Sequence, residues 1–237
     1  ARTYVLKLLG KNEFFDIHST QASQVYLGLE AETAKINRAV RSTRALAIFY
    51  ENKLIEAVFH SSSGGRTEDS GKVWKYQLPY LISVVDYDQN STKYRWSKKF
   101  SSSELDQIFS YLGGLNSIQI IKRSNSDRVL MIKLFGPNGT KYISGKTFRE
   151  NLKLLSNKFD INLKFNQIKF DNNVVENLVF ESIPPIPADY FLIVEGYGAG
   201  HGVGMSQWGA KSMAERGVNF RQILRHYYSG VQIKTYF

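Results

Sequence analysis

Residues 196–210 read GYGAGHGVGMSQWGA, with glycine at every second position over the first nine residues. In an extended chain, successive side chains point to opposite faces, so one face of this stretch would be bare backbone. The other face would carry the residues between the glycines, which are Tyr197, Ala199, His201 and Val203. Glycine within a strand usually marks a place where another backbone or a ligand comes close. The stretch therefore predicts either a tight crossing of two chain segments or a surface against which a ligand lies.

The glycine spacing does not match two common functional motifs. No G-x-G-x-x-G register fits between Gly196 and Gly204, so the stretch is not a dinucleotide-binding fingerprint. Residues 204–208, GMSQW, have tryptophan where the G-x-S-x-G turn of a serine hydrolase needs glycine. Both classes of site are excluded for this stretch.

The two ends of the chain carry both helical and strand-like apolar spacing. The expected helices are the turns that end at Gly10, and residues 32–43, 205–216 and 219–228. The expected strands are 45–50, 54–59 and 190–195, with a further short strand at the carboxyl end. The turn 51–53 would join the first two strands as a hairpin.

The middle of the chain has a pattern of its own. Ser101 and Glu104 form a capping box, S-x-x-E, followed by apolar residues at helical spacing. Strands are expected near 117–123 and 128–135, and β-rich structure over 160–182. This mixture of helices and strands is typical of an α+β unit.

A chain of 237 residues suggests one or two domains. We expect an α+β fold in which residues 1–97 and 191–237 form one two-part domain. Residues 98–190 would be a smaller inserted α+β subdomain, with the proline-rich residues 184–187 as a stiff connector back to the first unit.

Composition narrows the function without fixing it. The chain has no cysteine, which excludes disulfides and thiolate metal sites. The formal net charge is +10, and this favours an anionic partner such as a nucleic acid, a membrane surface or an acidic polymer. No stretch of 18 apolar residues occurs, so we expect no transmembrane segment in this chain.

A second polar motif precedes the glycine-rich one. Residues 60–65 read HSSSGG, an imidazole and three hydroxyls in a glycine-containing loop. Many donors and acceptors in one loop suit a polyhydroxylated ligand. A plain Ser/Gly-rich turn is the alternative. Histidine next to serine in sequence does not make a catalytic triad.

Aromatic and acidic residues follow this loop. Aromatic rings with polar tips serve sugar rings and nucleobases alike, but they also fill cores. The rings in this region are Trp74, Tyr76, Tyr80, Tyr87, Tyr94 and Trp96. A conventional glycosidase needs two carboxylates, and no spacing nominates a pair. The candidates are Glu68, Asp69, Asp86 and Asp88.

The combination HSSSGG…VW…LPYL…SV, then GHGVGMSQWGA and YYSGV, resembles the stage II sporulation protein D family (SpoIID/LytB-type), with phrasing similar to cyanobacterial members. The initial ARTY fits the same pattern. The resemblance implies a peptidoglycan lytic transglycosylase that acts on denuded glycan strands. One glutamate would serve as acid and then base, while the C6 hydroxyl of MurNAc attacks C1 and leaves a 1,6-anhydro ring.

The resemblance also implies roles for individual residues. Arg2 would support catalysis by orienting the acid or a substrate carboxylate. The family's catalytic glutamate matches no residue here, and we expect it upstream of Ala1. The implied substrate-binding residues are His60, Ser61, Ser62, Ser63, Gly64, Gly65, Glu68, Trp74, Tyr80, His201, Gln207 and Trp208. Some members hold zinc near the position of His18, but a single imidazole cannot, so we expect no metal and no cofactor.

Two other functions stay open at this point. A non-catalytic glycan-binding module, similar to the family's amidase-enhancer branch, is the main alternative. A nucleic-acid-binding protein is a remote one, and we expect no nucleic-acid partner. The expected partners are peptidoglycan glycan strands and a cell-wall amidase. The location would then be extracytoplasmic, with anchoring by a segment upstream of Ala1.

Overall fold

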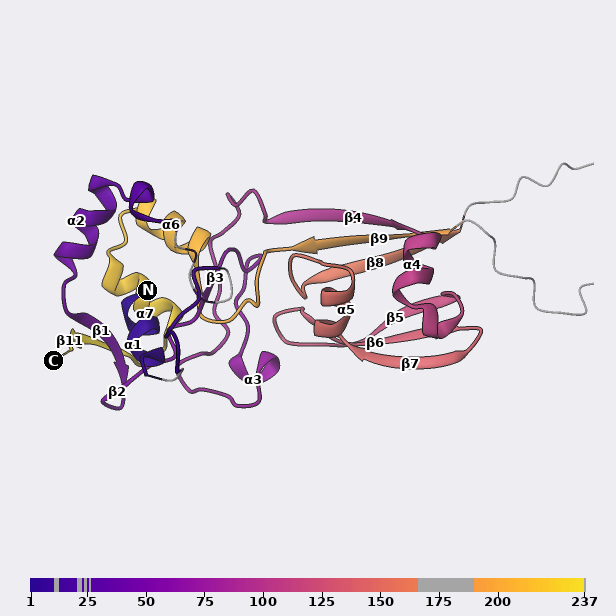
Figure 1. Ribbon diagram of the computed structural model, residues 1–237, viewed down its shortest axis with the longest axis horizontal. Coiled ribbons are helices and arrows are strands. Elements are labelled where there is room, and N and C mark those ends of the chain that lie inside the picture. Colours follow the sequence, from indigo (N-terminus) through magenta and orange to yellow (C-terminus); the bar gives the residue numbers. More distant parts are fainter. Residues whose placement is uncertain (11–12, 21–22, 24, 26, 166–189, 237) are drawn as a thin grey trace, which may run out of the picture.

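The computed structural model describes residues 1–10, 13–20, 23, 25, 27–165 and 190–236. It is a mixed α+β structure with several small sheets, which confirms the expected fold class. Figure 1 shows two lobes side by side. We call them the terminal lobe, which holds both ends of the chain, and the strand lobe, which holds the long strands β4 and β9.

The terminal lobe is assembled from both ends of the chain. Its helices are α1 (Arg2–Leu8), η1 (Leu29–Ala31), α2 (Ala34–Ser42), α3 (Ser70–Val73), α6 (Gln207–Glu215) and α7 (Phe220–Tyr227). Its strands are β1 (Leu46–Tyr50), β2 (Lys53–Leu54), β3 (Phe59–His60), β10 (Met205–Ser206) and β11 (Gln232–Thr235). β1 pairs antiparallel with both β11 and β2, so the last strand lies beside one of the first. β10 pairs parallel with β3.

The strand lobe contains two antiparallel sheets. Its strands are β4 (Arg95–Ser101), β5 (Ser117–Arg123), β6 (Val129–Gly136), β7 (Gly139–Ser144), β8 (Phe159–Phe165) and β9 (Tyr190–Tyr197). Its helices are α4 (Ser102–Ile108), η2 (Ser110–Leu112) and α5 (Gly145–Asn151). The strand orders are β4-β9-β8 and β5-β6-β7. Figure 1 shows α4 and α5 between the two sheets.

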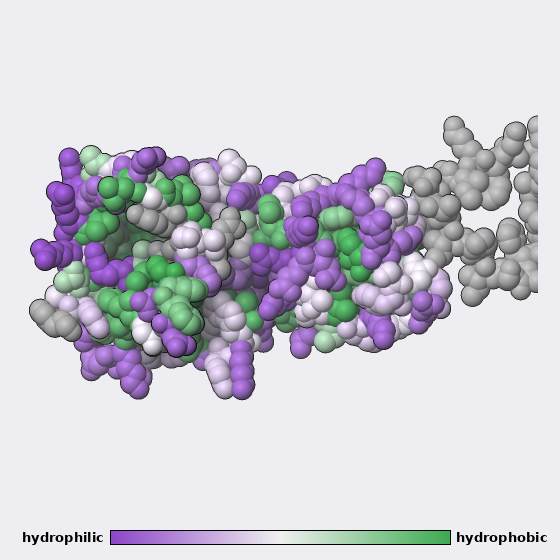
Figure 2. Space-filling view, viewed as in Figure 1, coloured by the Kyte–Doolittle hydropathy of each residue, from purple (hydrophilic) through white to green (hydrophobic). Residues whose placement is uncertain are grey.

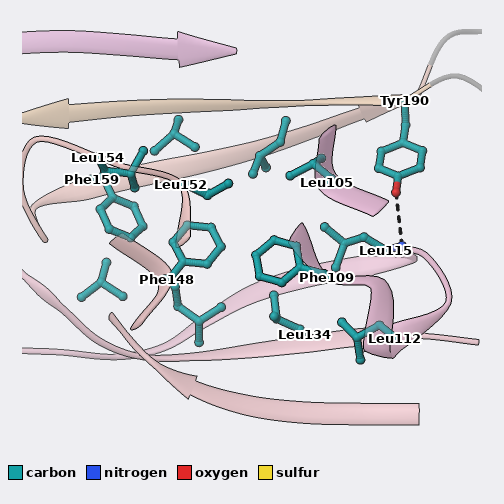
Figure 3. Packing of buried hydrophobic residues seen from close by; sticks show 14 residues of the cluster. Leu105, Phe109, Leu112, Leu115, Leu134, Phe148, Leu152, Leu154, Phe159 and Tyr190 are labelled. Atoms are coloured by element: carbon teal, nitrogen blue, oxygen red, sulfur yellow. Dashed lines mark hydrogen bonds between the residues drawn. The ribbon is translucent and has the colours of Figure 1, made fainter. Parts of the chain in front are cut away.

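Each lobe buries its own hydrophobic cluster. In the strand lobe, Phe109 at the end of α4, Phe148 of α5 and Leu192 of β9 are fully buried, and Figure 3 shows the two phenylalanines between the sheets. In the terminal lobe, Ile55 and Tyr227 belong to a second cluster. The division into residues 1–97 with 191–237 and an inserted 98–190 stays a prediction.

Polar side chains hold α1 on the first strand. Thr3 is buried, and its hydroxyl accepts a hydrogen bond from the Ile48 N–H at 3.1 Å. Lys7 donates to the Leu54 carbonyl at 3.0 Å.

Many apolar side chains of the first 45 residues are exposed. Figure 2 shows hydrophobic residues around a hollow on this lobe.

Several local predictions are confirmed and one is wrong. The capping box predicted at Ser101 forms, because the Ser101 side chain accepts from the Glu104 N–H and the Glu104 side chain accepts from the Ser101 N–H. The structure also has a capping box at Asn219, at the start of α7. The hairpin turn forms with positive φ at Glu51 and Asn52, but the strand expected over 54–59 does not. Only the short β2 and β3 form there. Most of the expected β-rich range 160–182, and the connector 184–187, lie outside the described residues.

Candidate functional site

Two segments named by their sequence meet where the lobes join: the glycine strip, residues 196–204, and the serine loop, residues 60–65. The strip is not extended beyond Tyr197, so the expectation of one bare face is wrong. Every second residue has positive φ instead: +72°, +110°, +81° and +71° at Gly198, Gly200, Gly202 and Gly204. Only glycine adopts this left-handed backbone without strain. The strip therefore curls along the serine loop.

Backbone hydrogen bonds join the strip to the loop. Ser62 and Ala199 exchange two of them, with N···O distances of 3.1 and 2.7 Å. The Glu68 N–H donates to the Gly202 carbonyl at 2.8 Å. A tight crossing of two chain segments, one of the two readings of the glycine spacing, is thus what the structure contains.

The glycines allow this crossing because no side chain would fit. A Cβ on Gly198 would lie 2.6 Å from the Ser62 carbonyl oxygen, and a Cβ on Gly204 2.3 Å from the Val58 carbonyl oxygen. A Cβ on Gly202 would lie 2.4 Å from a guanidinium nitrogen of Arg128. Contacts this short exclude any substitution without movement of the backbone or of that buried side chain.

The two histidines of the motifs each form a hydrogen bond across the crossing. His60 Nδ1 donates to the Val203 carbonyl, and His201 Nε2 donates to the Phe59 carbonyl, both at 3.1 Å. His201 Nδ1 accepts from the Val203 N–H at 3.1 Å, which fits a single neutral tautomer. Burial lowers the pKa of His201 to about 4 and that of His60 well below 6.5. Both imidazoles are therefore neutral at physiological pH.

Two buried aspartates, Asp86 and Asp88, support the serine loop. Asp88 accepts hydrogen bonds from the Ser62 hydroxyl and from the N–H groups of Gly64 and Gly65, at 2.5, 2.8 and 2.8 Å. Asp86 accepts from the Ser63 hydroxyl and the Tyr227 hydroxyl, both at 2.5 Å. The serines expected to meet a ligand thus donate to the protein's own carboxylates. Both aspartates are among the carboxylates considered from the sequence, but no spacing in the sequence signals this role.

Arg128, which sequence reasoning missed, reaches the crossing from the start of β6. It is 2% exposed and donates to the carbonyls of Ser63 and Arg66 at 2.7 and 3.0 Å. Its Nη1 also donates to the Ser126 hydroxyl, which donates to Glu68 Oε2; both distances are 2.8 Å. Burial lowers the pKa of Arg128 to about 10, and the nearby Glu68 carboxylate acts against that shift. A hydrogen-bonded chain from the Arg128 guanidinium through the Ser126 hydroxyl to the Glu68 carboxylate therefore ties the strand lobe to the serine loop.

The remaining predicted residues fall into two groups. Five have surface beside the crossing: Ser61, Gly65, Trp74, Gln207 and Trp208. Trp74 is 41% exposed, and its ring centroid lies 5.2 Å from that of His201. The Trp208 N–H donates to the Ser61 carbonyl at 3.1 Å. By contrast, His60, Ser62, Ser63, Gly64 and Glu68 are buried within it.

Arg2 and Tyr80 lie in other surroundings. The Arg2 guanidinium donates to the backbone carbonyls of Val40, Thr43 and Leu46, and so ties α1 to the segment before β1. Tyr80 is 8% exposed in the core of the terminal lobe, where its hydroxyl accepts from the Glu56 N–H at 3.0 Å. Their expected catalytic and binding roles stay predictions.

The chemistry available at the crossing favours binding. Both histidines are neutral and each donates one hydrogen bond to a backbone carbonyl, while His60 Nε2 is buried without a partner among the described residues. Glu68 is 1% exposed, and both of its carboxylate oxygens accept hydrogen bonds. The accessible edge of the crossing offers the Ser61 hydroxyl, the Gln207 amide and the indole rings of Trp74 and Trp208. These groups suit a polyhydroxylated ligand. Within the described residues, no three histidine, aspartate or glutamate side chains gather as a metal site would require. None of the helices in the described part of the chain combines the length and apolar character needed to cross a bilayer.

Comparison with known proteins bears on the whole chain. A family model described as SpoIID, Stage II sporulation protein, matches residues 1–50. The chain is 32% identical over 253 residues to stage II sporulation protein D of Bacillus amyloliquefaciens, covering 98% of this chain and 65% of that protein. It is 31% identical over 252 residues to stage II sporulation protein D of Bacillus subtilis strain 168, covering 98% and 66%.

A third similarity is to a protein of Bacillus subtilis strain 168 named amidase enhancer. The identity is 28% over 274 residues, covering 100% of this chain and 37% of that protein. The chain thus spans less than two thirds of the length of each of these relatives. Similarity of this extent across nearly the whole chain, with the family-model match at its amino end, shows that the chain belongs to the stage II sporulation protein D family.

Proposed function

We propose that this chain is the glycan-binding and catalytic-domain part of a peptidoglycan lytic transglycosylase that acts on denuded glycan strands. The observation that carries the proposal is the crossing itself. It packs the two family motifs into one unit and leaves Ser61, Trp74, Gln207 and Trp208 with surface along its edge. Membership of the family supports the same reading. The net charge of +10 would attract a strand that carries a carboxylate on each MurNAc.

The proposed reaction needs one acid that later acts as a base. A glutamate protonates the glycosidic oxygen between MurNAc and GlcNAc, and the bond to C1 breaks. The same carboxylate then takes the proton of the MurNAc C6 hydroxyl, whose oxygen attacks C1 and closes the 1,6-anhydro ring. We propose that this glutamate lies upstream of Ala1. Glu68 does not suit this role, because a general acid must come within hydrogen-bond distance of the substrate oxygen and Glu68 is buried.

The residues described here would bind and orient the strand. We propose that the exposed group contacts sugar rings and hydroxyls, with the Trp74 face as a stacking surface. The buried group, His60, Ser62, Ser63 and Glu68, would hold the serine loop in place. This substrate implies a location outside the cytoplasmic membrane.

A second function has a specific observation in its favour. A relative named amidase enhancer aligns with 100% of this chain, and Glu68, the carboxylate at the crossing, is only 1% exposed. A non-catalytic module that holds glycan for a partner amidase would need no acid at all. Cleavage distinguishes the two functions, and binding is common to both.

The test is digestion of purified, amidase-treated glycan strands, with products identified by mass spectrometry. The chain of residues 1–237 and the full-length native protein are compared. Products ending in 1,6-anhydro-MurNAc from the full-length protein alone would support the proposal with the acid outside residues 1–237. Strand binding without cleavage by either would favour the non-catalytic module, and absence of both binding and cleavage would refute both functions.

A binding variant locates the site. Replacing Trp74 by alanine removes a ring that is 41% exposed, so folding should be little affected. Loss of one stacked ring, worth about 1 kcal/mol, should weaken strand binding about fivefold. The matched control is Tyr142→Ala on β7, because that ring is 60% exposed and lies in the other lobe. If the two variants bind glycan strands equally well, Trp74 is not part of the binding site.

A further inference from the structure

Three cations next to the serine loop form no ion pair with another described residue. Arg66 follows the loop, Arg95 begins β4 and Lys158 precedes β8. The ion pairs among the described residues are made by other cations, namely Arg123, Lys146 and Lys211. Figure 2 shows hydrophilic surface where the two lobes meet.

Tyr197 organises two of these cations. Its ring centroid lies 5.4 Å from the guanidinium carbon of Arg95 and 5.8 Å from Lys158 Nζ. Its backbone is fixed on both sides, because its N–H donates to the Lys158 carbonyl at 2.8 Å and its carbonyl accepts from the Ser156 hydroxyl at 2.6 Å. Tyr94 packs edge-on against the same ring at 5.9 Å. The two charges are thus held by rigid neighbours.

This arrangement touches the predicted sugar-binding loop directly. Lys158 Nζ donates to the Gly64 carbonyl at 2.9 Å. A Cβ on Gly64 would lie 2.7 Å from Tyr197 Cβ, so the loop backbone packs on that residue. A ligand that contacts the accessible end of the loop at Gly65 would therefore lie near Lys158 and, across the Tyr197 ring, near Arg95.

The electrostatics of this place favour a bound anion. Lys158 is half-buried, and its pKa is lowered by burial first and then by the positive charge of Arg128. Arg66 acts in the same direction, while Asp127 and Asp88 act against it. An incoming carboxylate would offset the repulsion among these cations.

We propose that Arg95 and Lys158, held by Tyr197, form a subsite for a sugar carboxylate beside the serine loop. The inference rests on the proposed function. A denuded strand presents a free lactyl carboxylate on each MurNAc, whereas a strand with stem peptides presents an uncharged amide there. The subsite therefore selects denuded strands, through charge-assisted hydrogen bonds that the amide cannot accept equally well.

Binding to two versions of one substrate tests the subsite. Denuded strands are compared with the same strands after their carboxyl groups are reduced to alcohols. Wild-type protein should bind the carboxylate form about tenfold more tightly, the factor for about 1.4 kcal/mol of charge-assisted bonding. Arg95→Gln/Lys158→Gln should bind both forms equally, at the affinity of wild type for reduced strands. Arg95→Gln alone, at an exposed position, should lose part of the preference even if the double variant does not fold.

The matched control is Lys133→Gln/Lys141→Gln, which removes the same charge from the β5-β6-β7 sheet. It should keep the wild-type preference for carboxylate strands. Equal loss in this control would overturn the subsite and leave only an effect of net charge. Wild-type protein that binds both strand types equally would overturn the subsite but not the proposed function. Wild-type protein that binds neither would overturn the proposed function and the subsite with it.

Discussion

Replacing Gly198 by alanine tests whether the glycine strip exists to let two backbones cross. The new Cβ would lie 2.6 Å from the Ser62 carbonyl oxygen and 2.8 Å from the Gly64 nitrogen. Both neighbours are backbone atoms of the serine loop, so neither can rotate away. Gly198 also has φ +72°, where an alanine side chain is strained.

The expected cost has two parts. The left-handed backbone costs alanine roughly 1–2 kcal/mol. Forcing the packed loop to move costs about 1–3 kcal/mol more, as overpacking does in well-packed interiors. The free energy of unfolding should therefore fall by roughly 2–5 kcal/mol. At about 2–4 °C per kcal/mol for a chain of this size, the Tm should drop by roughly 4–20 °C.

Gly217 provides a matched control. It follows α6 with φ +84°, and a Cβ there would meet nothing within 4 Å. Gly217→Ala carries the same backbone strain, and the same gain from a less flexible unfolded chain, without the clash. The free energy of unfolding of both variants is measured with urea. The difference between them gives the cost of the clash, which we expect to be about 1–3 kcal/mol. If Gly198→Ala is no more destabilising than Gly217→Ala, close packing of the strip is not what requires glycine.

Two further predictions concern buried charge. Arg128→Met leaves the buried Glu68 without the nearby positive charge and should cost about 3–5 kcal/mol of unfolding free energy. Ser126→Ala removes only the bridging hydroxyl and should cost about 1–3 kcal/mol. Equal values in urea unfolding would contradict a role for the Arg128 charge. The pKa values of His60 and His201 are lowered below 6.5 in the folded state, the latter to about 4, so the unfolded chain binds more protons and stability must fall as the pH drops below 6.5. The loss should be about 1–2 kcal/mol per histidine between pH 6.5 and 5, and a His60→Gln/His201→Gln variant that kept the full wild-type slope would refute it.

Local sequence patterns predicted most of the secondary structure. The capping box predicted at Ser101 depends on contacts within one helical turn, so a few neighbouring residues specify it. The hairpin prediction over 45–59 was right about the turn and wrong about the second strand, since alternation persists where pairing stops after Leu54. Neighbouring residues cannot report how far a partner strand extends.

The backbone conformation of the glycine strip could not be predicted from the sequence alone. Its alternation fits an extended chain and a curled one equally, because glycine tolerates both signs of φ. Contact with the serine loop, more than 130 residues away in the chain, decides between them.

The sequence by itself determined the α+β class, the helix capped at Ser101 and the two motifs that mark the family. Only the tertiary structure decided that Asp86, Asp88 and Arg128 hold those motifs together. Each of the three acts through contacts with residues more than 20 positions away, and no local spacing encodes such contacts. Burial then fixed which polar groups of the motifs bond to the protein and which keep surface for a ligand, because a buried donor or acceptor must find its partner inside the fold.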